Sequence, residues 1–264
     1  MSTQTMPQTP VEIRELIRTT EYTGVTGGLA PGFVQANLVI LPEEQAFDFL
    51  LFCQRNPRPC PLLEVIEPGH VETKQTAPGA DIRTDISSYH IFEDGQLVST
   101  ETDVRKYWRE DLVSFLLGCS FTFEGAMVDS GIPMRHWELD RNVTMFRTNF
   151  ECTPAGSFSG PMVVSMRPIH HSKIVRAVQV TSRFPGAHGA PIHIGDPSAI
   201  GISDITKPDY GEPTVFEDGE IPVFWACGVT PQAVAFNSKP PFMITHGPGH
   251  MFITDLRDTD LAAL

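Results

Sequence analysis

The stretch Ile221–Gln232 places a cysteine at the junction of two expected elements. Its residues Pro222–Cys227 are apolar and precede a glycine, which predicts a short buried strand. Thr230 followed by Pro231 predicts a helix start, because threonine caps helix N-termini and proline fits the first helical position. Cys227 would lie beside free amide N–H groups and the positive end of a helix dipole, where a thiol ionises more easily. The alternative is a small core residue, since free cysteine is commonly buried.

Cys119 stands at a second junction of the same kind. The apolar run Leu112–Leu117 predicts a helix that ends at the following glycine, a residue that often terminates helices. Another helix is predicted over Phe121–Val128, with Glu124 in its first turns. We therefore predict that Cys119 and Cys227 line one cavity, as general acids, general bases or packing residues.

Arg167 is predicted to leave a buried strand, Met162–Met166. The planar guanidinium group can pair both oxygens of a carboxylate, so Arg167 is a candidate carboxylate clamp, and a structural salt bridge is the alternative. The helix starts at Asp196-Pro197 and Thr230-Pro231 offer backbone N–H groups to an oxyanion or a second carboxylate. The predicted substrate-binding residues are Arg83, Arg167, His188, Asp196 and Thr230.

Histidine is concentrated in the second half of the chain, where His193 falls in a short expected strand and His246 follows another. Imidazole and carboxylate groups there can serve as acid and base, and a metal site built from His193, His246 and Asp196 is an alternative. The HExxH spacing of helical zinc sites is absent, so we predict no metal. The predicted catalytic residues are Cys119, Glu124, His193, Asp204, Cys227 and His246.

The elements that must position these side chains include both helices and strands. A capping box at Thr9–Glu12 predicts a helix to about Thr19, and Asp94-Gly95 predicts a β-hairpin. The glycine-rich loop 24–32 lacks the spacing of phosphate-binding motifs, and we interpret it as a connector. Residues 1–8 are expected to be disordered. Further expected elements are helices over 42–53 and 172–182 and strands over 62–66, 89–92, 96–100, 143–150 and 162–166.

This mixture predicts an α/β fold (mixed α+β) of two closely packed α/β subdomains with mixed sheets. At 264 residues the chain exceeds one average domain. We place an N-terminal α/β part at 1–140 and a C-terminal α/β part, with most motif residues, at 141–264. A discontinuous domain is the alternative.

The composition excludes several classes of protein. A formal charge of −13 without a Lys/Arg stripe argues against nucleic-acid binding. No apolar run approaches the roughly 20 residues of a membrane span, and the N-terminus lacks the basic and apolar regions of a secretory signal. The five cysteines are odd in number and show no CxxC or zinc pattern, so we expect reduced thiols and a cytoplasmic location.

Several long segments match one known family in order. They are GCSFTFE (118–124), VVSMRP (163–168), HGAPIHIGDP (188–197), PVFWACGVTPQ (222–232), ITHGPGHMF (244–252), NPRPCPLLE (56–64) and DIRTD (81–85). Through them the chain resembles the D-glutamate cyclase family from about Gly32 to Asp255, and the bacterial members of that family are commonly described as hydro-lyases. The resemblance implies a two-part α/β architecture and reversible dehydration of D-glutamate to 5-oxo-D-proline, or of a related small acid. It assigns no catalytic residues.

Cyclisation of glutamate requires the α-amine, as the free base, to attack the γ-carboxyl group with loss of water. The reaction needs a carboxylate clamp, a base for the amine proton, donors for the oxyanion and an acid for the leaving hydroxyl, and in principle no cofactor. Three alternatives stay open: a two-thiol racemase or epimerase, an amide hydrolase acting on a small amino acid, and a non-catalytic protein that binds an acidic metabolite. The expected partner is a small-molecule carboxylate, without nucleic acid or membrane, and a homo-oligomer is compatible with each alternative.

Overall fold

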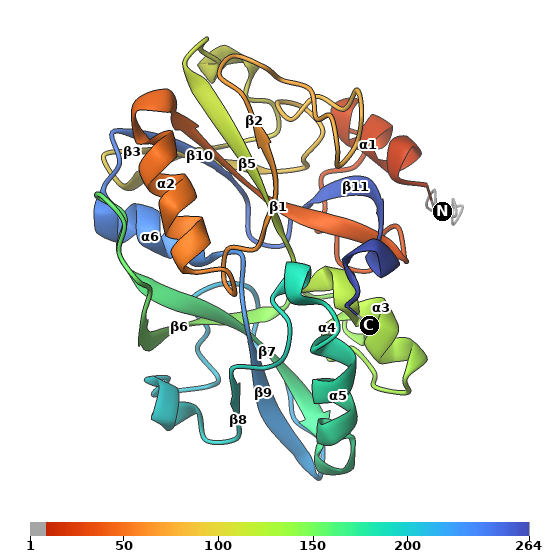
Figure 1. The fold of residues 1–264 in the computed structure, drawn as a ribbon. Helices are drawn as coiled ribbons and strands as arrows, with labels where there is room; N and C mark the ends of the chain where they lie inside the picture. Colours follow the sequence, from red (N-terminus) through yellow and green to blue (C-terminus); the bar gives the residue numbers. More distant parts are fainter. Residues whose placement is uncertain (1–8, 264) are drawn as a thin grey trace.

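The computed structural model describes residues 9–263 as helices packed around two sheets (Figure 1). The first sheet has the strand order β2-β5-β1-β10-β3-β4, with β11 also paired to β1. Its strands are β1 Phe33–Pro42, β2 Leu62–Ile66, β3 Tyr89–Glu93, β4 Gln96–Glu101, β5 Leu112–Gly118, β10 Phe242–His246 and β11 Phe252–Arg257. The second sheet has the order β6-β7-β9-β8, and its strands are β6 Thr144–Glu151, β7 Pro161–His170, β8 His193–Ile194 and β9 Glu220–Ala226.

Helices lie around the two sheets, and α3 and α5 pack together beside the second sheet (Figure 1). The α-helices are α1 Pro10–Arg18, α2 Glu43–Arg55, α3 Phe121–Asp129, α4 Arg135–Glu138, α5 Ile174–Thr181 and α6 Thr230–Ser238. The 3₁₀ helices are Arg105–Tyr107, His171–Lys173, Pro185–Ala187, Pro197–Ile200 and Asp258–Leu261. The expected helices over 42–53 and 172–182 correspond to α2 and α5, so both predictions are confirmed.

β1 and β5 form the centre of the first sheet. Their antiparallel pairing runs from Ala36 opposite Gly118 to Pro42 opposite Leu112. A strand covered on both faces reads as a continuous apolar run, and so does a short buried helix. The predicted helix over Leu112–Leu117 is wrong because this segment is β5, which pairs with β1 on one side and β2 on the other.

β7 is longer than its apolar run suggests. The strand was expected over Met162–Met166, but pairing with β9 continues to His170. Arg167 therefore lies inside β7, opposite Val223, and the expectation that it leaves the strand is wrong. The pairing with β6 reaches only Met166, so Pro168 needs no backbone donor on that side.

The predicted α/β class, a mixture of helices and sheets, is confirmed. The strand pairs within residues 9–263 are antiparallel, whereas we expected mixed sheets. β10 and β11 pair with β1, so the first sheet contains strands from both ends of the chain. The division of the chain into parts 1–140 and 141–264 stays a prediction.

Local patterns predicted two further features correctly. Thr9 caps α1 by accepting a hydrogen bond from the amide of Glu12. Asp94 and Gly95, with φ of 49° and 76°, form the turn between β3 and β4, and this left-handed geometry matches the twist of a tight hairpin. The expected disorder of residues 1–8 concerns a segment outside the described residues.

The start of α6 differs in detail from the sequence prediction. Pro231 lies in the first helical turn as expected, but the capping residue is Val229, so the predicted Thr230 cap is wrong. A turn closed by the Thr230 amide and the Cys227 carbonyl precedes the helix. The hydroxyl of Thr230 donates to the same carbonyl at 2.6 Å, which ties β9 to α6.

Candidate active site

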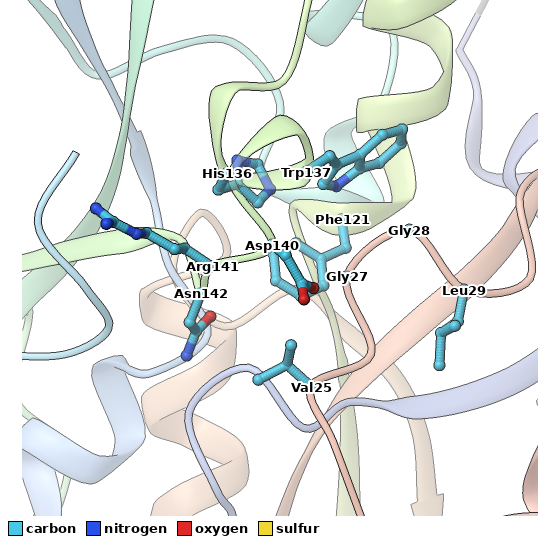
Figure 2. Close-up of a pocket in the computed structure, with 10 residues that line it drawn as sticks. All are labelled: Val25, Gly27, Gly28, Leu29, Phe121, His136, Trp137, Asp140, Arg141 and Asn142. Atoms are coloured by element: carbon cyan, nitrogen blue, oxygen red, sulfur yellow. The ribbon is translucent and has the colours of Figure 1, made fainter. Parts of the chain in front are cut away.

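A cavity of about 310 Å³ opens beside α3 and α4 (Figure 2). Its walls come from the glycine-rich loop before β1, the first residue of α3, and the segment 136–142. The lining residues are Val25, Gly27, Gly28, Leu29, Phe121, His136, Trp137, Asp140, Arg141 and Asn142. Two of them, His136 and Trp137, hydrogen-bond to a buried carboxylate behind the wall. The cavity is therefore in contact with a buried polar network.

The short helix α4 is held in place by Arg135. The guanidinium group of Arg135 forms ion pairs with Glu138 at 2.9 Å, Glu217 at 2.8 Å and Glu220 at 2.9 Å. A single helical turn has little stability of its own, so such tertiary contacts must stabilise it. They tie α4 to β9 and thereby place His136 between α3 and the cavity.

Glu124, on the first turns of α3, is fully buried. Its Oε1 accepts hydrogen bonds from Nε of Arg167 at 2.9 Å and from Nη2 of the same residue. Its Oε2 accepts from Nε1 of Trp137 at 2.9 Å and hydrogen-bonds to Nε2 of His136 at 3.1 Å. Burial alone would raise the pKa of Glu124, but the charges and hydrogen bonds of His136 and Arg167 outweigh it and lower the pKa to about 2. Glu124 is therefore a carboxylate at neutral pH.

Arg167 is 2% exposed, and protein groups surround its guanidinium. Besides Glu124, it donates from Nη1 to the Ser165 hydroxyl and from Nη2 to the Ser120 hydroxyl, both at 3.0 Å. Its guanidinium carbon lies 5.4 Å from the ring centres of both Phe123 and Trp225, a cation–π arrangement. Arg167 thus has protein partners for most of its donors.

Cys119 and Cys227 lie in one buried cluster with Met251 and with Phe121, which also lines the cavity. Burial raises the pKa of Cys227 to about 11 and raises that of Cys119 further. Neighbouring amides act in the opposite direction, as the helix-start argument requires, but their effect is smaller. The expected easier ionisation is therefore wrong, because loss of hydration outweighs the favourable amide contacts.

Four residues singled out from the sequence are brought together. The electrostatic surroundings of the Cys119 thiol include Cys227, which directly follows β9, Glu124 of α3 and Arg167 of β7. Phe121 packs with both thiols and also lines the cavity, and His136 of the cavity wall hydrogen-bonds to Glu124, so this cluster adjoins the wall. It is the part of the predicted site that the fold assembles.

The polar groups of the cavity wall are not among the residues predicted from the sequence. Asp140 has a left-handed backbone with φ of 50°, and Figure 2 shows its carboxylate directed toward Val25 across the cavity. Arg141 extends away from the other lining residues toward the rim, where its Nη1 donates to the Pro213 carbonyl at 3.2 Å. Non-glycine residues with this backbone are strained, and they are enriched at functional sites.

The glycine-rich loop, interpreted as a connector, also forms part of this wall. The backbone N–H groups of Gly27 and Gly28 form no hydrogen bond with any group of residues 9–263. Unpaired amides in a cavity wall can receive an anion.

The sequence did contain a signal for the other part of the wall. The run RHWELDRN (135–142) combines an imidazole, an indole and four charged groups besides histidine within one helical turn and its flanking residues.

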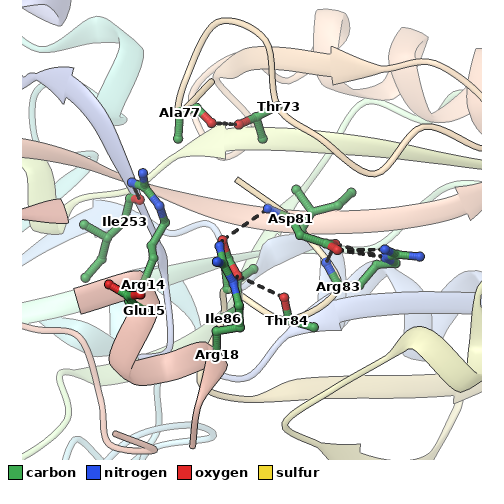
Figure 3. Close-up of polar contacts among 12 residues, drawn as sticks. Arg14, Glu15, Arg18, Thr73, Ala77, Asp81, Arg83, Thr84, Ile86 and Ile253 are labelled. Carbon is green, nitrogen blue, oxygen red and sulfur yellow. Dashed lines mark hydrogen bonds and ion pairs between the residues drawn. The ribbon is translucent and has the colours of Figure 1, made fainter. Parts of the chain in front are cut away.

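Arg83, a predicted substrate-binding residue, lies elsewhere (Figure 3). Its Nη2 pairs with Oδ2 of Asp81 at 2.7 Å, and its guanidinium carbon lies 5.8 Å from the ring centre of Trp108. The side chain is not part of the cavity wall described above. The structure places Arg83 in a partly exposed ion pair beside the first sheet.

Three other predicted residues lie in the segment 193–207, which begins with β8 and which we call the 193–207 loop. Asp196 caps a 3₁₀ turn by accepting from the amide of Ser198 at 2.9 Å. Asp204 accepts from the amide of Thr206 at 3.0 Å and pairs with Lys207 at 3.0 Å. Nε2 of His193 hydrogen-bonds to the Asp196 carbonyl at 2.7 Å. These side chains hold the loop's own turns and are not part of the cavity beside α4.

His246 is fully buried in β10. It shares a strand face with Ile244, which packs against Leu38 and Ile91 in the core of the first sheet, in a cluster separate from the one that contains the thiols. Its Nδ1 accepts from the Leu38 amide at 3.1 Å, and its Nε2 has no hydrogen-bond partner among the described residues. Burial lowers the pKa of His246 to about 3.

His188 and Thr230 are both buried and do not line the cavity beside α4. Nδ1 of His188 hydrogen-bonds to the Arg58 carbonyl at 2.6 Å. Burial lowers the pKa of His188 to about 4, and the nearby charge of Arg167 acts in the same direction, so its ring is neutral at pH 7. Thr230 accepts from the amide of Val163 at 3.1 Å, which links β7 to α6.

Within residues 9–263, no group of three or more His, Cys, Asp or Glu side chains is arranged to hold a metal ion. In the same part of the chain, none of the helices combines the length and the apolar character that a bilayer crossing requires. The five cysteines are free and buried.

Residues 113–255 match the family model described as D-glutamate cyclase. A relative from Geobacillus kaustophilus is 60% identical and covers 98% of both chains. One from Stutzerimonas stutzeri is 59% identical and covers 97% of this chain and 96% of its own; both carry the name "Putative hydro-lyase". Among solved structures, a nitrogen repressor-like protein from Methanococcus jannaschii covers 97% of this chain and 98% of its own at 11% identity and a TM-score of 0.41.

Proposed function

Because the chain belongs to the D-glutamate cyclase family, we propose that it is a hydro-lyase that reversibly removes water from D-glutamate, or from a related small acid. With D-glutamate the product is 5-oxo-D-proline. The observation that carries this proposal is similarity over nearly the whole chain to relatives named "Putative hydro-lyase". The cavity beside α4 supports it, since about 310 Å³ suits a small molecule.

Glutamate carries two carboxylates and an ammonium group, and the cavity offers a partner for each. The carboxylate of Asp140 suits the ammonium group. The unpaired amides of Gly27 and Gly28 suit one carboxylate, and the guanidinium of Arg141 at the rim suits the other. In this proposal, groups of the cavity wall bind the substrate carboxylates, which is the role that the sequence predicted for Arg167.

Proton transfer is assigned to His136, the imidazole in the wall. It accepts the proton of the substrate ammonium group, which frees the amine to attack the γ-carboxyl carbon. The C–N bond forms, and His136 returns this proton to a carboxylate oxygen of the tetrahedral intermediate. His136 then takes a second proton from the nitrogen and delivers it to the same oxygen, so the C–O bond breaks, water leaves and the ring nitrogen keeps one hydrogen. Reversal of these steps opens the ring, so one residue serves both directions.

The two thiols contribute packing behind the wall in this mechanism. Their raised pKa values keep both protonated at neutral pH, which favours imidazole over thiolate as the base. A two-thiol racemase would need one thiolate on each side of a substrate carbon. Deuterium exchange at Cα without ring closure distinguishes that alternative from dehydration.

Proton NMR of the purified protein with D-glutamate, L-glutamate and both 5-oxoprolines in heavy water tests the proposal. Ring closure or opening with the D-isomers is the expected result. Deuterium at Cα without ring closure would instead support a racemase, and saturable binding without turnover would support a binding protein. Loss of turnover with a chelator would show that a metal is required.

Two variants test the assigned residues. We expect His136→Gln to lower kcat by about 10²–10⁴-fold, the usual contribution of a general acid or base. His170→Gln, which changes an exposed histidine of β7, is the matched control. We expect Arg141→Gln to raise KM more than it lowers kcat, with Arg109→Gln, in an exposed ion pair, as its control. Equal effects in variant and control would contradict the assignment.

A further inference from the structure

We propose that Glu124 and Arg167 are positioning residues that orient His136, with Nε2 of the imidazole donating its hydrogen to Glu124 and Nδ1 left as the proton acceptor. This inference rests on the proposed role of His136 in proton transfer. It changes the roles predicted from the sequence, where Glu124 is an acid or base and Arg167 a carboxylate clamp. Neither residue lines the cavity, and both reach it through α4.

The two oxygens of Glu124 are divided between two sets of donors. Oε1 receives both Nε and Nη2 of Arg167, and Oε2 receives the Trp137 indole. Nε2 of His136 lies 3.1 Å from each oxygen, and its hydrogen bond runs to Oε2. The carboxylate is thus anchored on one side by β7 and faces the cavity wall on the other.

The chemistry of these groups determines which ring nitrogen carries the hydrogen. An ionised carboxylate can only accept hydrogen bonds, so Nε2 of His136 must be the donor. A neutral imidazole carries one hydrogen, which leaves the lone pair of Nδ1 free to accept a proton. A carboxylate that holds the tautomer of a proton-transferring histidine in this way is a recurring arrangement in enzymes.

The surroundings of Arg167 prevent the carboxylate from turning away. Ser120 and Ser165 bind the two Nη atoms, and the rings of Phe123 and Trp225 flank the guanidinium plane. A structural ion pair between β7 and α3 would need none of the contacts to α4. The contacts from Oε2 to His136 and Trp137 connect this pair to the cavity and distinguish a positioning role.

The wild-type protein alone can test the tautomer. Nitrogen-15 NMR of the histidine rings, at a pH where His136 is neutral, distinguishes Nε2–H from Nδ1–H, and His136→Gln identifies the signal by its absence. We expect the Nε2–H form. An Nδ1–H form would overturn the inference, and because the measurement needs no substrate, its result is independent of whether the protein cyclises glutamate.

Glu124→Gln is the sharper test, since the amide has one oxygen and one NH₂ group. The oxygen is expected to face the two donors of Arg167, which places the NH₂ group against Nε2 of His136. The imidazole must then accept at Nε2, so its hydrogen moves to Nδ1. We expect this shift by NMR, together with a kcat lower by at least about 10²-fold and a KM within about threefold, because a wrong tautomer costs up to about 10⁴ in kcat.

Ser120→Ala is the matched control, because it removes a partner of Arg167 and leaves the Glu124 carboxylate in place. We expect the Nε2–H tautomer to persist in this variant. A folded Glu124→Gln protein with an unchanged tautomer and unchanged kcat would overturn the proposal. If Glu124→Gln does not fold, the wild-type tautomer decides.

Discussion

Two polar regions of this molecule contain carboxylates with similar pKa values in opposite surroundings. The pKa of Glu124 is lowered to about 2 although burial opposes its ionisation, because Arg167 and His136 compensate its charge. The pKa of Asp204, in the 193–207 loop, is also lowered to about 2, by hydrogen bonds to Thr206 and an ion pair with Lys207 at the surface. The same shift therefore has different origins.

The difference lies in what happens when a partner is lost. At the surface, water and salt replace a missing partner, so the pair contributes little. In the interior, a missing partner leaves a charge with neither hydration nor compensation, which is far more costly. A lowered pKa alone does not identify a functional carboxylate, and burial with partners on several elements is the more informative feature.

The largest difference in stability between the buried and the surface ion pairs is expected when Arg167 is removed. We expect Arg167→Met to lower the free energy of unfolding by about 3–5 kcal/mol, because the buried Glu124 carboxylate loses its guanidinium partner. Denaturant unfolding measures the loss, and Arg105→Met, from an exposed pair with Asp103, is the control in which little should change. The double variant Glu124→Leu, Arg167→Met should recover stability. If the single variant matches its control, the network is not a buried ion pair in solution.

The second-largest effect is expected in the dependence of stability on acid pH. Because the folded pKa of Glu124 lies below its ordinary value of 4.5, its contribution to stability is complete above about pH 4.5 and is lost as pH falls toward about 2. We expect Glu124→Gln to remove a pH-dependent contribution on the order of 3 kcal/mol from stability measured across this range. This difference should persist in 1 M salt. If 1 M salt abolishes this dependence of stability on pH, Glu124 behaves like the surface carboxylate of Asp204.

The comparison also explains how much could be predicted from the sequence. The cap at Thr9 and the hairpin at Asp94 depend on neighbouring residues, so local patterns were sufficient. β5 was mistaken for a helix because a run buried on both faces has no periodicity, and only its partner strands decide its structure. His136 was missed because its contact with Glu124 joins α3 to α4 after the chain has turned back at Gly131.

The thiols provide a third test of burial. With the pKa of Cys227 raised to about 11 and Cys119 raised further, the thiolate fraction of the folded protein at pH 8 is small. We expect both to react with a thiol reagent at least about 10²-fold more slowly than in the unfolded chain, where thiols have ordinary pKa values. Mass spectrometry after limited labelling assigns each site. Rapid labelling of Cys227 in the folded protein would restore the reactive thiol expected from the helix start.

The smallest effects are expected in the 193–207 loop. Asp196→Ala and Asp204→Asn each remove a cap from a turn that water can solvate, so the unfolding midpoint should change little, and 1 M salt should reduce even that change for Asp204. Turnover is the second measurement, because the sequence pattern marked both residues as parts of the site. A loss of turnover comparable to that of His136→Gln would mean that the loop reaches the cavity during the reaction. The Glu124 network and the 193–207 loop would then be two parts of one site, and burial would no longer distinguish the functional carboxylate of Glu124 from the carboxylates of the loop.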